Sequence, residues 1–336
     1  MGLKLYPETA VINLANAIRS AYGGISTSYR VSDMASAILN IPSSSESGPL
    51  NVELTLSILN GTVSGVVSDS TNIIYQIAPY AFHKCSYITG ADFPICTSIG
   101  SYAFGAYYYY NSVTTRLSYV SFPVCTSIGD GAFYQCSSLT SVDFPLCVFI
   151  GSDAFGNCYS LSSISFPVCT SIDEDAFAIC SSLTSVSFPS CTFIGNYTFS
   201  SCTNLVSISF PACTSIDYAA FSNCYKLESA YFPVCSIVER YTFTKCSSLS
   251  TASFPSCIMI GSQAFYSCYN LLALYLMGSS VCSLVNINAF QSTPISNYTT
   301  STGGVYGSIY VPASLLANYK TATNWVTYSN RMVGVS

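Results

Sequence analysis

Cysteine is the residue type in this chain that could carry the most chemistry, because 17 of the 336 residues are Cys. From Cys125 to Cys268 one Cys occurs every 11 residues, whereas Cys282 stands outside this spacing. The spacing defines two alternating series. One follows Phe-Pro pairs, at Cys96, Cys125, Cys147, Cys169, Cys191, Cys213, Cys235 and Cys257, and the other precedes a Leu or Ile, at Cys85, Cys136, Cys158, Cys180, Cys202, Cys224, Cys246 and Cys268.

These thiols could bind zinc, form disulfides or pack as small apolar side chains. A zinc site needs closely spaced Cys pairs or His partners, and neither pattern occurs. Disulfides between stacked repeats are a second alternative, because stacked Cα atoms about 5 Å apart fall within bonding range. Two observations argue against them: the side chains of one column point the same way, and the total number of Cys is odd. We favour the third reading, in which each Cys turns a buried corner. Reduced thiols in this number indicate folding in a reducing compartment.

Candidates for catalysis are sparse. His83 is the single histidine, so no Ser-His-Asp arrangement exists, and we expect His83 to be an exposed turn residue. The densest acidic cluster is Asp173-Glu174-Asp175, which could bind a cation but is more typical of a solvated turn. A catalytic pair of carboxylates from neighbouring repeats is an alternative that the sequence does not decide. No nucleotide-binding or hydrolase motif occurs. The sequence therefore predicts no enzyme, no cofactor and no metal.

Composition narrows the classes of partner. Half of the residues are hydrophobic and 7% are charged, so Ser, Thr, Tyr and Gly must supply the polar surface. A net charge of −5 with only 10 Lys and Arg argues against nucleic acid. No apolar run of about 18 residues predicts membrane insertion. Residues 1–21 lack the blocks of a signal peptide, so we expect either another export route or a lost leader.

An internal repeat is the strongest signal in the sequence. Phe-Pro pairs begin at Phe93, Phe122, Phe144, Phe166, Phe188, Phe210, Phe232 and Phe254, with steps of 22 residues after the first gap of 29. A second marker, Ala-Phe or Thr-Phe, ends at Phe82, Phe104, Phe133, Phe155, Phe177, Phe199, Phe221, Phe243, Phe265 and Phe290. Two markers in step predict one structural unit that recurs along the chain.

The unit at 136–157 shows how each repeat should fold. Leu139, Val142 and Phe144 have the L-x-x-L-x-L spacing, and the last two share one face of a short strand. Pro145 cannot donate to a strand ladder and should end that strand. The segment 150–151 predicts a second short extended piece, and 154–155 a tight return, either a turn or a 3₁₀ segment. Stacked units would place each apolar residue about 4.8 Å from its copies.

This pattern resembles the BspA-like leucine-rich-repeat family of bacterial and protist surface proteins. The resemblance covers 78–290 and rests on the recurring S-I-G-x-x-A-F-x-x-C-x-x-L-x-x-V-x-F-P, although the family's usual unit is one residue longer. It implies a leucine-rich-repeat solenoid, mainly β with short turns or 3₁₀ segments. It also implies a role in adhesion and protein binding, without naming a ligand.

The ends differ from the array. Residues 1–41 predict a small helical module, 42–49 a linker, and 50–77 an N-terminal cap with a hairpin at Asn60-Gly61 and a degenerate repeat. Within the module, 14–19 and 32–38 resemble a short element of phage tail-associated proteins of Firmicutes. Residues 291–336 predict a C-terminal cap with a last strand at 307–312, a helix at 313–321 and a packed Trp325.

Two features predict a ligand surface. The outward strand positions form a track of Ser with Tyr towards both ends, and an insertion between Phe104 and Leu117 carries four consecutive Tyr. The insertion is either an aromatic contact patch or a loop covering an apolar seam. The Ser track is either a docking platform or a device for packing a crowded sheet. The candidate residues are Tyr107, Tyr108, Tyr109, Tyr110, Tyr119, Ser141, Asp143, Ser163, Ser165, Ser185, Ser187, Tyr231 and Tyr275.

The sequence thus favours a non-catalytic binding or adhesion module for a protein or glycan, displayed outside the cytoplasm on a bacterial surface or a phage particle. The alternative is a structural spacer or a tail-associated component of a prophage particle. An ice-binding face ranks low, because it calls for a Thr-x-Thr array. The ligand and the oligomeric state stay open.

Overall fold

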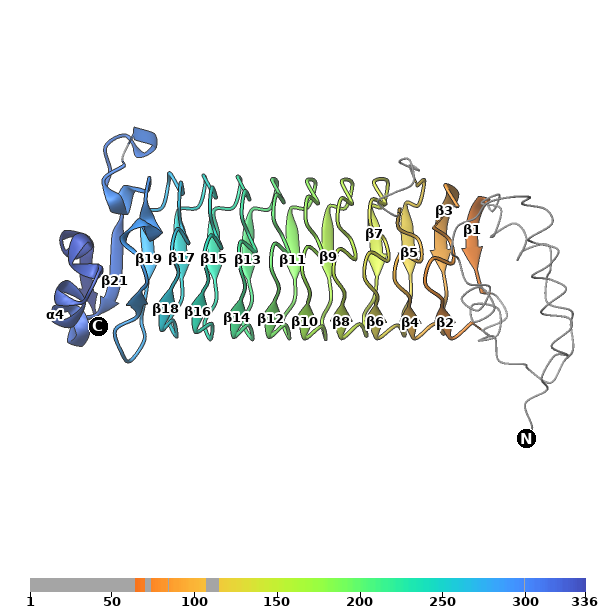
Figure 1. The fold of residues 1–336 in the computed structure, drawn as a ribbon, viewed down its shortest axis with the longest axis horizontal. Helices are drawn as coiled ribbons and strands as arrows, with labels where there is room; N and C mark the ends of the chain where they lie inside the picture. The colour runs from red at the N-terminus through yellow and green to blue at the C-terminus, as the bar shows by residue number, and fades with distance from the viewer. Residues whose placement is uncertain (1–63, 70–73, 84, 107–114, 299) are drawn as a thin grey trace, which may run out of the picture.

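The computed structural model describes residues 64–336 except 70–73, 84, 107–114 and 299. The helical module at 1–41, the linker at 42–49, the Asn60-Gly61 turn and the tyrosines at 107–110 lie outside the described residues. Within the described part, the chain winds into an elongated rod of stacked coils, with the C-terminus at one end (Figure 1). No helix in that part is both long and apolar enough to cross a membrane.

Each regular coil contributes one strand to each of two parallel arrays. The first array comprises β1 (Ser64–Ser68), β3 (Tyr87–Asp92), β5 (Tyr119–Ser121), β7 (Ser141–Asp143), β9 (Ser163–Ser165), β11 (Ser185–Ser187), β13 (Ser207–Ser209), β15 (Ser229–Tyr231), β17 (Thr251–Ser253) and β19 (Ala273–Tyr275). The second comprises β2 (Gln76–Ile77), β4 (Ser98–Ile99), β6 (Ser127–Ile128), β8 (Phe149–Ile150), β10 (Ser171–Ile172), β12 (Phe193–Ile194), β14 (Ser215–Ile216), β16 (Ile237–Val238), β18 (Met259–Ile260) and β20 (Ser283–Leu284). The second array is one continuous ten-stranded sheet.

Strand register shows why the coils stack. Ser185 pairs with Ser163 and Val186 with Ile164, so equivalent residues lie side by side in neighbouring coils. A further column of backbone hydrogen bonds runs through the Ala-Phe turns, where the Phe155 N–H donates to the Ala176 carbonyl at 2.7 Å. These ladders satisfy the backbone by pairing each coil with the next. The predicted short strand at Val142, the second extended piece and the stacking of units are confirmed.

Two columns of phenylalanine fill the interior. Within one column the rings of Phe155 and Phe177 lie 5.2 Å apart and 3° from parallel. Within the other, Phe166 and Phe188 lie 5.4 Å and 4° apart. The columns meet edge to face, as Phe177 and Phe188 do at 5.9 Å. Both geometries are favourable for aromatic rings, so the array has one continuous core.

All 17 cysteines are buried as thiols, with none in a disulfide, which confirms that they pack as small core residues. Their thiols also donate hydrogen bonds, which the sequence did not predict. In one series the thiol reaches a carbonyl two residues on, as Cys147 does to Phe149 at 3.2 Å. In the other it reaches the Phe carbonyl of the preceding coil, as Cys180 does to Phe155 at 3.2 Å. Burial raises the pKa of Cys180 to about 12, which keeps this donor protonated.

The return turns impose left-handed backbone on residues other than glycine. Asp153 and Asn157 have φ of 56° and 61°, and Ile179 has φ of 60° at the position equivalent to Asn157 one coil later. A β-branched residue is strained in this region. A 3₁₀ segment occurs at the Ala-Phe position of the last coil only, as η1 (Ile287–Phe290), so in the described regular coils the return is a turn.

His83 differs from its predicted state. It is half-buried rather than exposed, with Nδ1 2.5 Å from the Tyr80 carbonyl oxygen and its ring edge-on to Tyr80 at 5.6 Å. His83 thus contacts Tyr80, three residues earlier, and the sequence alone did not reveal these contacts. At this end β1 pairs in parallel with β3, with a register shift between Gly65 and Val66.

The C-terminal segment closes the rod. It contains η2 (Pro294–Ser296), η3 (Thr300–Thr302), β21 (Ser308–Pro312), η4 (Ala313–Leu315), α4 (Leu316–Thr321), η5 (Trp325–Arg331) and β22 (Met332–Val335). Trp325 is fully buried, and its ring packs 5.9 Å from Phe290 at the end of a phenylalanine column. The predicted last strand is not the last, because β22 pairs with β21 and extends the first array by one more strand.

Candidate functional site

The outer face of the first strand array is built from strands of three residues. The middle residue points into the core and the two flanking residues point outwards, because successive side chains alternate across a strand. Ile164 is buried, whereas Ser163 and Ser165 are exposed. Residues at equivalent positions of paired strands therefore form two parallel rows, which we call the outer face.

The middle coils give the outer face its regular part. The structure brings together the exposed candidates Ser141, Asp143, Ser163, Ser165, Ser185 and Ser187. Register pairs Ser163 with Ser185 and Ser165 with Ser187. The sequence prediction that the outward positions form a Ser track is therefore realised in the geometry.

The hydroxyls beside the outer face and those on it differ in their hydrogen bonds. Thr140 Oγ1 donates to the Ser118 carbonyl at 2.9 Å, and Thr184 Oγ1 donates to the Ser162 carbonyl at 3.0 Å. By contrast, within the described residues the side chains of Ser163, Ser165, Ser185 and Ser187 make no hydrogen bond to the protein. The rows on the outer face therefore hold donors and acceptors that are available to a ligand.

Aromatic side chains flank the regular part towards the N-terminal coils. Tyr119 is 38% exposed, and its ring lies against Gly90 of the preceding coil. A Cβ at Gly90 would come within 2.3 Å of the Tyr119 ring, so the glycine is required for this close approach. Arg116 stacks on the Tyr87 ring with 5.1 Å between Cζ and the centroid. Gly90, Arg116 and Tyr87 were not among the predicted ligand-surface residues. The available signal was the Gly at an outward strand position where the other coils carry Tyr, Ser, Thr or Ala.

Towards the C-terminal end the outer face becomes aromatic again. Tyr231 is 47% exposed, and register places Ser253, Tyr275 and Tyr310 in the same row. Tyr275 and Tyr310 stack with centroids 4.6 Å apart. Tyr310 was missed because it belongs to the cap strand, although its alternation with buried Ile309 and Val311 could have revealed it. The candidates at 107–110 lie outside the described residues and are not placed.

A group of acidic residues lies on a different edge, at the turns before the Ala-Phe pairs. Burial, together with Asp153 and Glu174, raises the pKa of Asp175 to about 6. Burial, Glu174 and Asp130 also raise the pKa of Asp153. In the part of the chain that the structure describes, no group of three or more His, Cys, Asp or Glu could hold a metal ion. This edge is therefore a set of mutually repelling carboxylates.

The fold and this surface define a parallel β-solenoid of the leucine-rich-repeat class. A family model described as the BspA type leucine rich repeat region matches in six copies, over 68–183, 105–228 and 170–296. These matches cover more than half of the chain, which therefore belongs to the BspA-type leucine-rich-repeat family. Proteins of this repeat class are generally non-catalytic, and no enzymatic family is indicated.

Solved structures with a similar architecture come from several bacteria. A leucine-rich repeat protein of Bacteroides ovatus is 21% identical, with a TM-score of 0.42, and the match covers 82% of this chain and 84% of that one. A leucine rich cell surface protein of Faecalibacterium prausnitzii is 19% identical, with a TM-score of 0.42 and coverage of 75% and 82%. A leucine-rich repeat protein of T. pallidum is 22% identical, with a TM-score of 0.36 and coverage of 61% and 77%. No curated protein matches the chain.

Proposed function

We propose that this chain is a non-catalytic binding or adhesion module whose outer face docks a protein or glycan ligand at a bacterial surface. The observation that carries the proposal is the two rows of exposed Ser hydroxyls that make no hydrogen bond within the described protein. Beside the outer face, by contrast, the Thr140 and Thr184 hydroxyls donate to backbone carbonyls of the preceding coil.

The physical case for docking rests on preorganisation. The strands hold the Ser rows in register, so a ligand pays little to order the protein. Ser side chains are small and lose little rotamer freedom on contact. Tyr119 and Tyr231 at the ends offer large contact areas at a low entropic cost. The outer face thus combines extended rows of polar side chains with aromatic side chains on either side of them.

A structural spacer, including a tail-associated component of a prophage particle, is the second candidate. The feature that favours it is the elongated rod of stacked coils, which would hold its two ends apart (Figure 1). A spacer needs no free hydroxyls on one face, whereas a docking platform does. Altering the outer face therefore separates the two functions.

The test compares two surface variants of the full chain. The double variant Ser163→Lys with Ser185→Lys places two long cations on the outer face, while Val148→Lys places one at an exposed position beside the second strand array. Binding is measured on a glycan microarray and by interferometry against a panel of purified extracellular proteins. We expect the double variant to weaken binding about tenfold or more and Val148→Lys to leave it unchanged. Equal binding by all forms, or none by the unaltered chain, would favour the spacer.

A further inference from the structure

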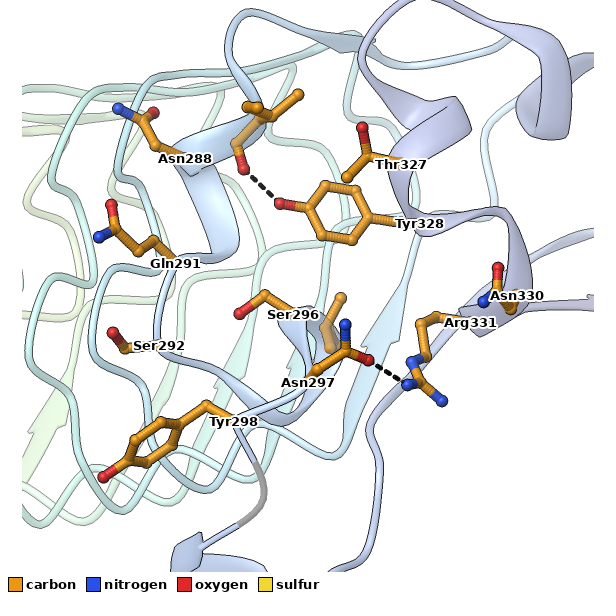
Figure 2. A pocket seen from close by; sticks show the side chains of 12 residues that line it. Asn288, Gln291, Ser292, Ser296, Asn297, Tyr298, Thr327, Tyr328, Asn330 and Arg331 are labelled. Carbon is orange, nitrogen blue, oxygen red and sulfur yellow. Dashed lines mark hydrogen bonds between the residues drawn. The ribbon is translucent and has the colours of Figure 1, made fainter.

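The C-terminal cap contains a hollow, lined by polar and apolar side chains, that is separate from the outer face. It lies between η1, η2 and η5, has a volume of about 490 Å³, and is shown from close by in Figure 2. Four amide side chains line it, from Asn288, Gln291, Asn297 and Asn330. Amides offer a donor and an acceptor side by side, which suits ligands that carry many hydroxyls.

A single cation sits on one side of this hollow in a fixed position. Arg331 donates from Nη2 to the Asn297 side-chain oxygen, as Figure 2 shows. Its guanidinium also stacks on Tyr306, with Cζ 3.8 Å from the ring centroid. These two contacts hold the planar fork in place and leave further N–H groups to donate. Such an arrangement is prepared for a carboxylate, which Arg binds with charge-assisted hydrogen bonds.

The charge pattern around Arg331 points to an anionic ligand. No Asp or Glu lines the hollow, and among the described residues Arg331 forms no ion pair. The chain as a whole has 15 acidic and only 10 basic residues, and one group of its carboxylates, including Asp153 and Asp175, lies at the coil turns. A fixed cation without an acidic partner, in an acidic protein, leaves a site that is complementary to negative charge.

We propose that this hollow binds an acidic sugar residue, with its carboxylate on Arg331 and its ring hydroxyls on the surrounding amides. Tyr298 is exposed at the rim and offers an aromatic face on which a sugar ring can pack. The exposed lining is more apolar than polar, with Ile287, Ile295 and two tyrosine rings beside the amides. A sugar ring combines apolar C–H faces with hydroxyls at its edge, so it fits this mixed lining. This site shares no residue with the outer face, so it goes beyond the proposed function and is tested separately.

The experiment is calorimetric titration of the full chain with glucuronate and with glucose, which differ in the carboxylate. An acetylated tripeptide with a free carboxyl end serves as the third probe. Two variants perturb the site: Arg331→Gln removes the cation, and Asn330→Asp keeps Arg331 but adds a repelling charge at an exposed rim position. Arg240→Gln is the matched control, because Arg240 also stacks on a tyrosine, Tyr241, at 5.6 Å, but on the acidic edge.

We expect glucuronate to bind in the millimolar range and glucose to bind at least about tenfold more weakly. Both site variants should lose about tenfold or more in affinity for glucuronate, and Arg240→Gln should lose none. Thermal melting of each variant establishes that the cap stays folded. Equal affinity for glucose, retained binding in folded Arg331→Gln, or no binding by any probe would overturn the proposal. Tighter binding of the tripeptide would overturn it in favour of a peptide carboxyl end.

Discussion

The regular coils and the C-terminal cap solve the same packing problem in different ways. In the coils, Phe188 meets copies of itself at 5.4 Å and 5.9 Å on its two sides. At the end of the array there is no further copy, so the exposed layer is covered by unlike residues. Trp325 and Tyr328 pack on Phe290 with centroids at 5.9 Å and 5.3 Å.

Backbone hydrogen bonding changes in the same way between the two regions. In a regular coil, the Cys257 N–H donates to the Phe254 carbonyl at 3.1 Å within its own turn. At Cys282 the N–H donates to the Tyr319 hydroxyl at 2.9 Å, and the carbonyl accepts from Trp325 Nε1 at 2.6 Å. Within the array, the repeated coils satisfy the hydrogen bonds of the backbone, whereas at its end particular side chains supply them. The two regions should therefore respond differently to mutation.

Trp325→Ala should have the largest effect, because it opens a cavity against Phe290 and leaves the buried Cys282 carbonyl without its donor. We expect a loss of about 5 kcal/mol from the free energy of unfolding of the cap. Hydrogen exchange should show lost protection in the last coil and the cap. Val326→Ala, at a neighbouring position with 57% exposure, is the control and should change little. Equal protection in both variants would show that the cap does not depend on its anchor.

Phe188→Ala tests the repetition in the array. The cavity should cost about 3–5 kcal/mol, as is usual for a buried Phe. Because each coil contacts only its neighbours, we expect faster exchange in the coils on either side of Phe188 and unchanged exchange in the cap. Urea unfolding combined with hydrogen-exchange mass spectrometry distinguishes a local loss of stability from a global one. A uniform loss along the whole rod would contradict this nearest-neighbour behaviour.

Asp175 should make the array sensitive to pH, and the cap should not share this behaviour. Burial and the nearby Asp153 and Glu174 raise its folded pKa to about 6, above the value of about 4 in an unfolded chain. The folded state therefore binds a proton more readily, so this group's stabilising contribution is complete below about pH 4 and is lost as pH rises through about 6.

Asp175→Asn should remove that dependence. At pH 7 we expect a gain in stability of about 1 kcal/mol or less, since the half-buried carboxylate is partly screened by solvent. The gain should vanish below about pH 4, as measured by urea titration across this range. Asp143→Asn, at an exposed position of the outer face, is the matched control. A gain that is independent of pH would exclude carboxylate repulsion as its cause.

Ile179→Asn should have an effect as small as that of Asp175→Asn, and it should also be stabilising. Ile179 is 42% exposed and has φ of 60°, whereas the equivalent position one coil earlier is Asn157 with φ of 61°. Asn tolerates left-handed backbone better than a β-branched residue, so we expect a gain of about 1 kcal/mol. Asn157→Ile, the reverse exchange, should lose a similar amount of stability. Thermal melting of both variants measures the two changes. A loss of stability for Ile179→Asn, or a gain for Asn157→Ile, would show that the turn is not strained.

Much of the array could be predicted from the sequence, because the spacing of its residues indicates which side chains are buried and which are exposed. The 22-residue period placed Ser163 and Ser165 outside and Phe166 inside, and register pairs each with its copy. The candidate site on the outer face followed from the same alternation. The contact between Gly90 and Tyr119 could not be predicted in this way. It depends on the Tyr119 ring lying against the preceding coil, and the repeat spacing does not specify that side-chain position.

The sequence by itself determined the repeat, the strand triplets, the phenylalanine columns and the burial of the cysteines, because identical units can bury an apolar face only against one another. The tertiary structure alone decided the thiol hydrogen bonds, the position of His83, the added strand β22 and the hollow beside Arg331. The last two of these features, β22 and the hollow, join residues that occur once and lie apart in the chain. Their contacts depend on how the closing segment folds back onto the last coil, which a local pattern does not specify.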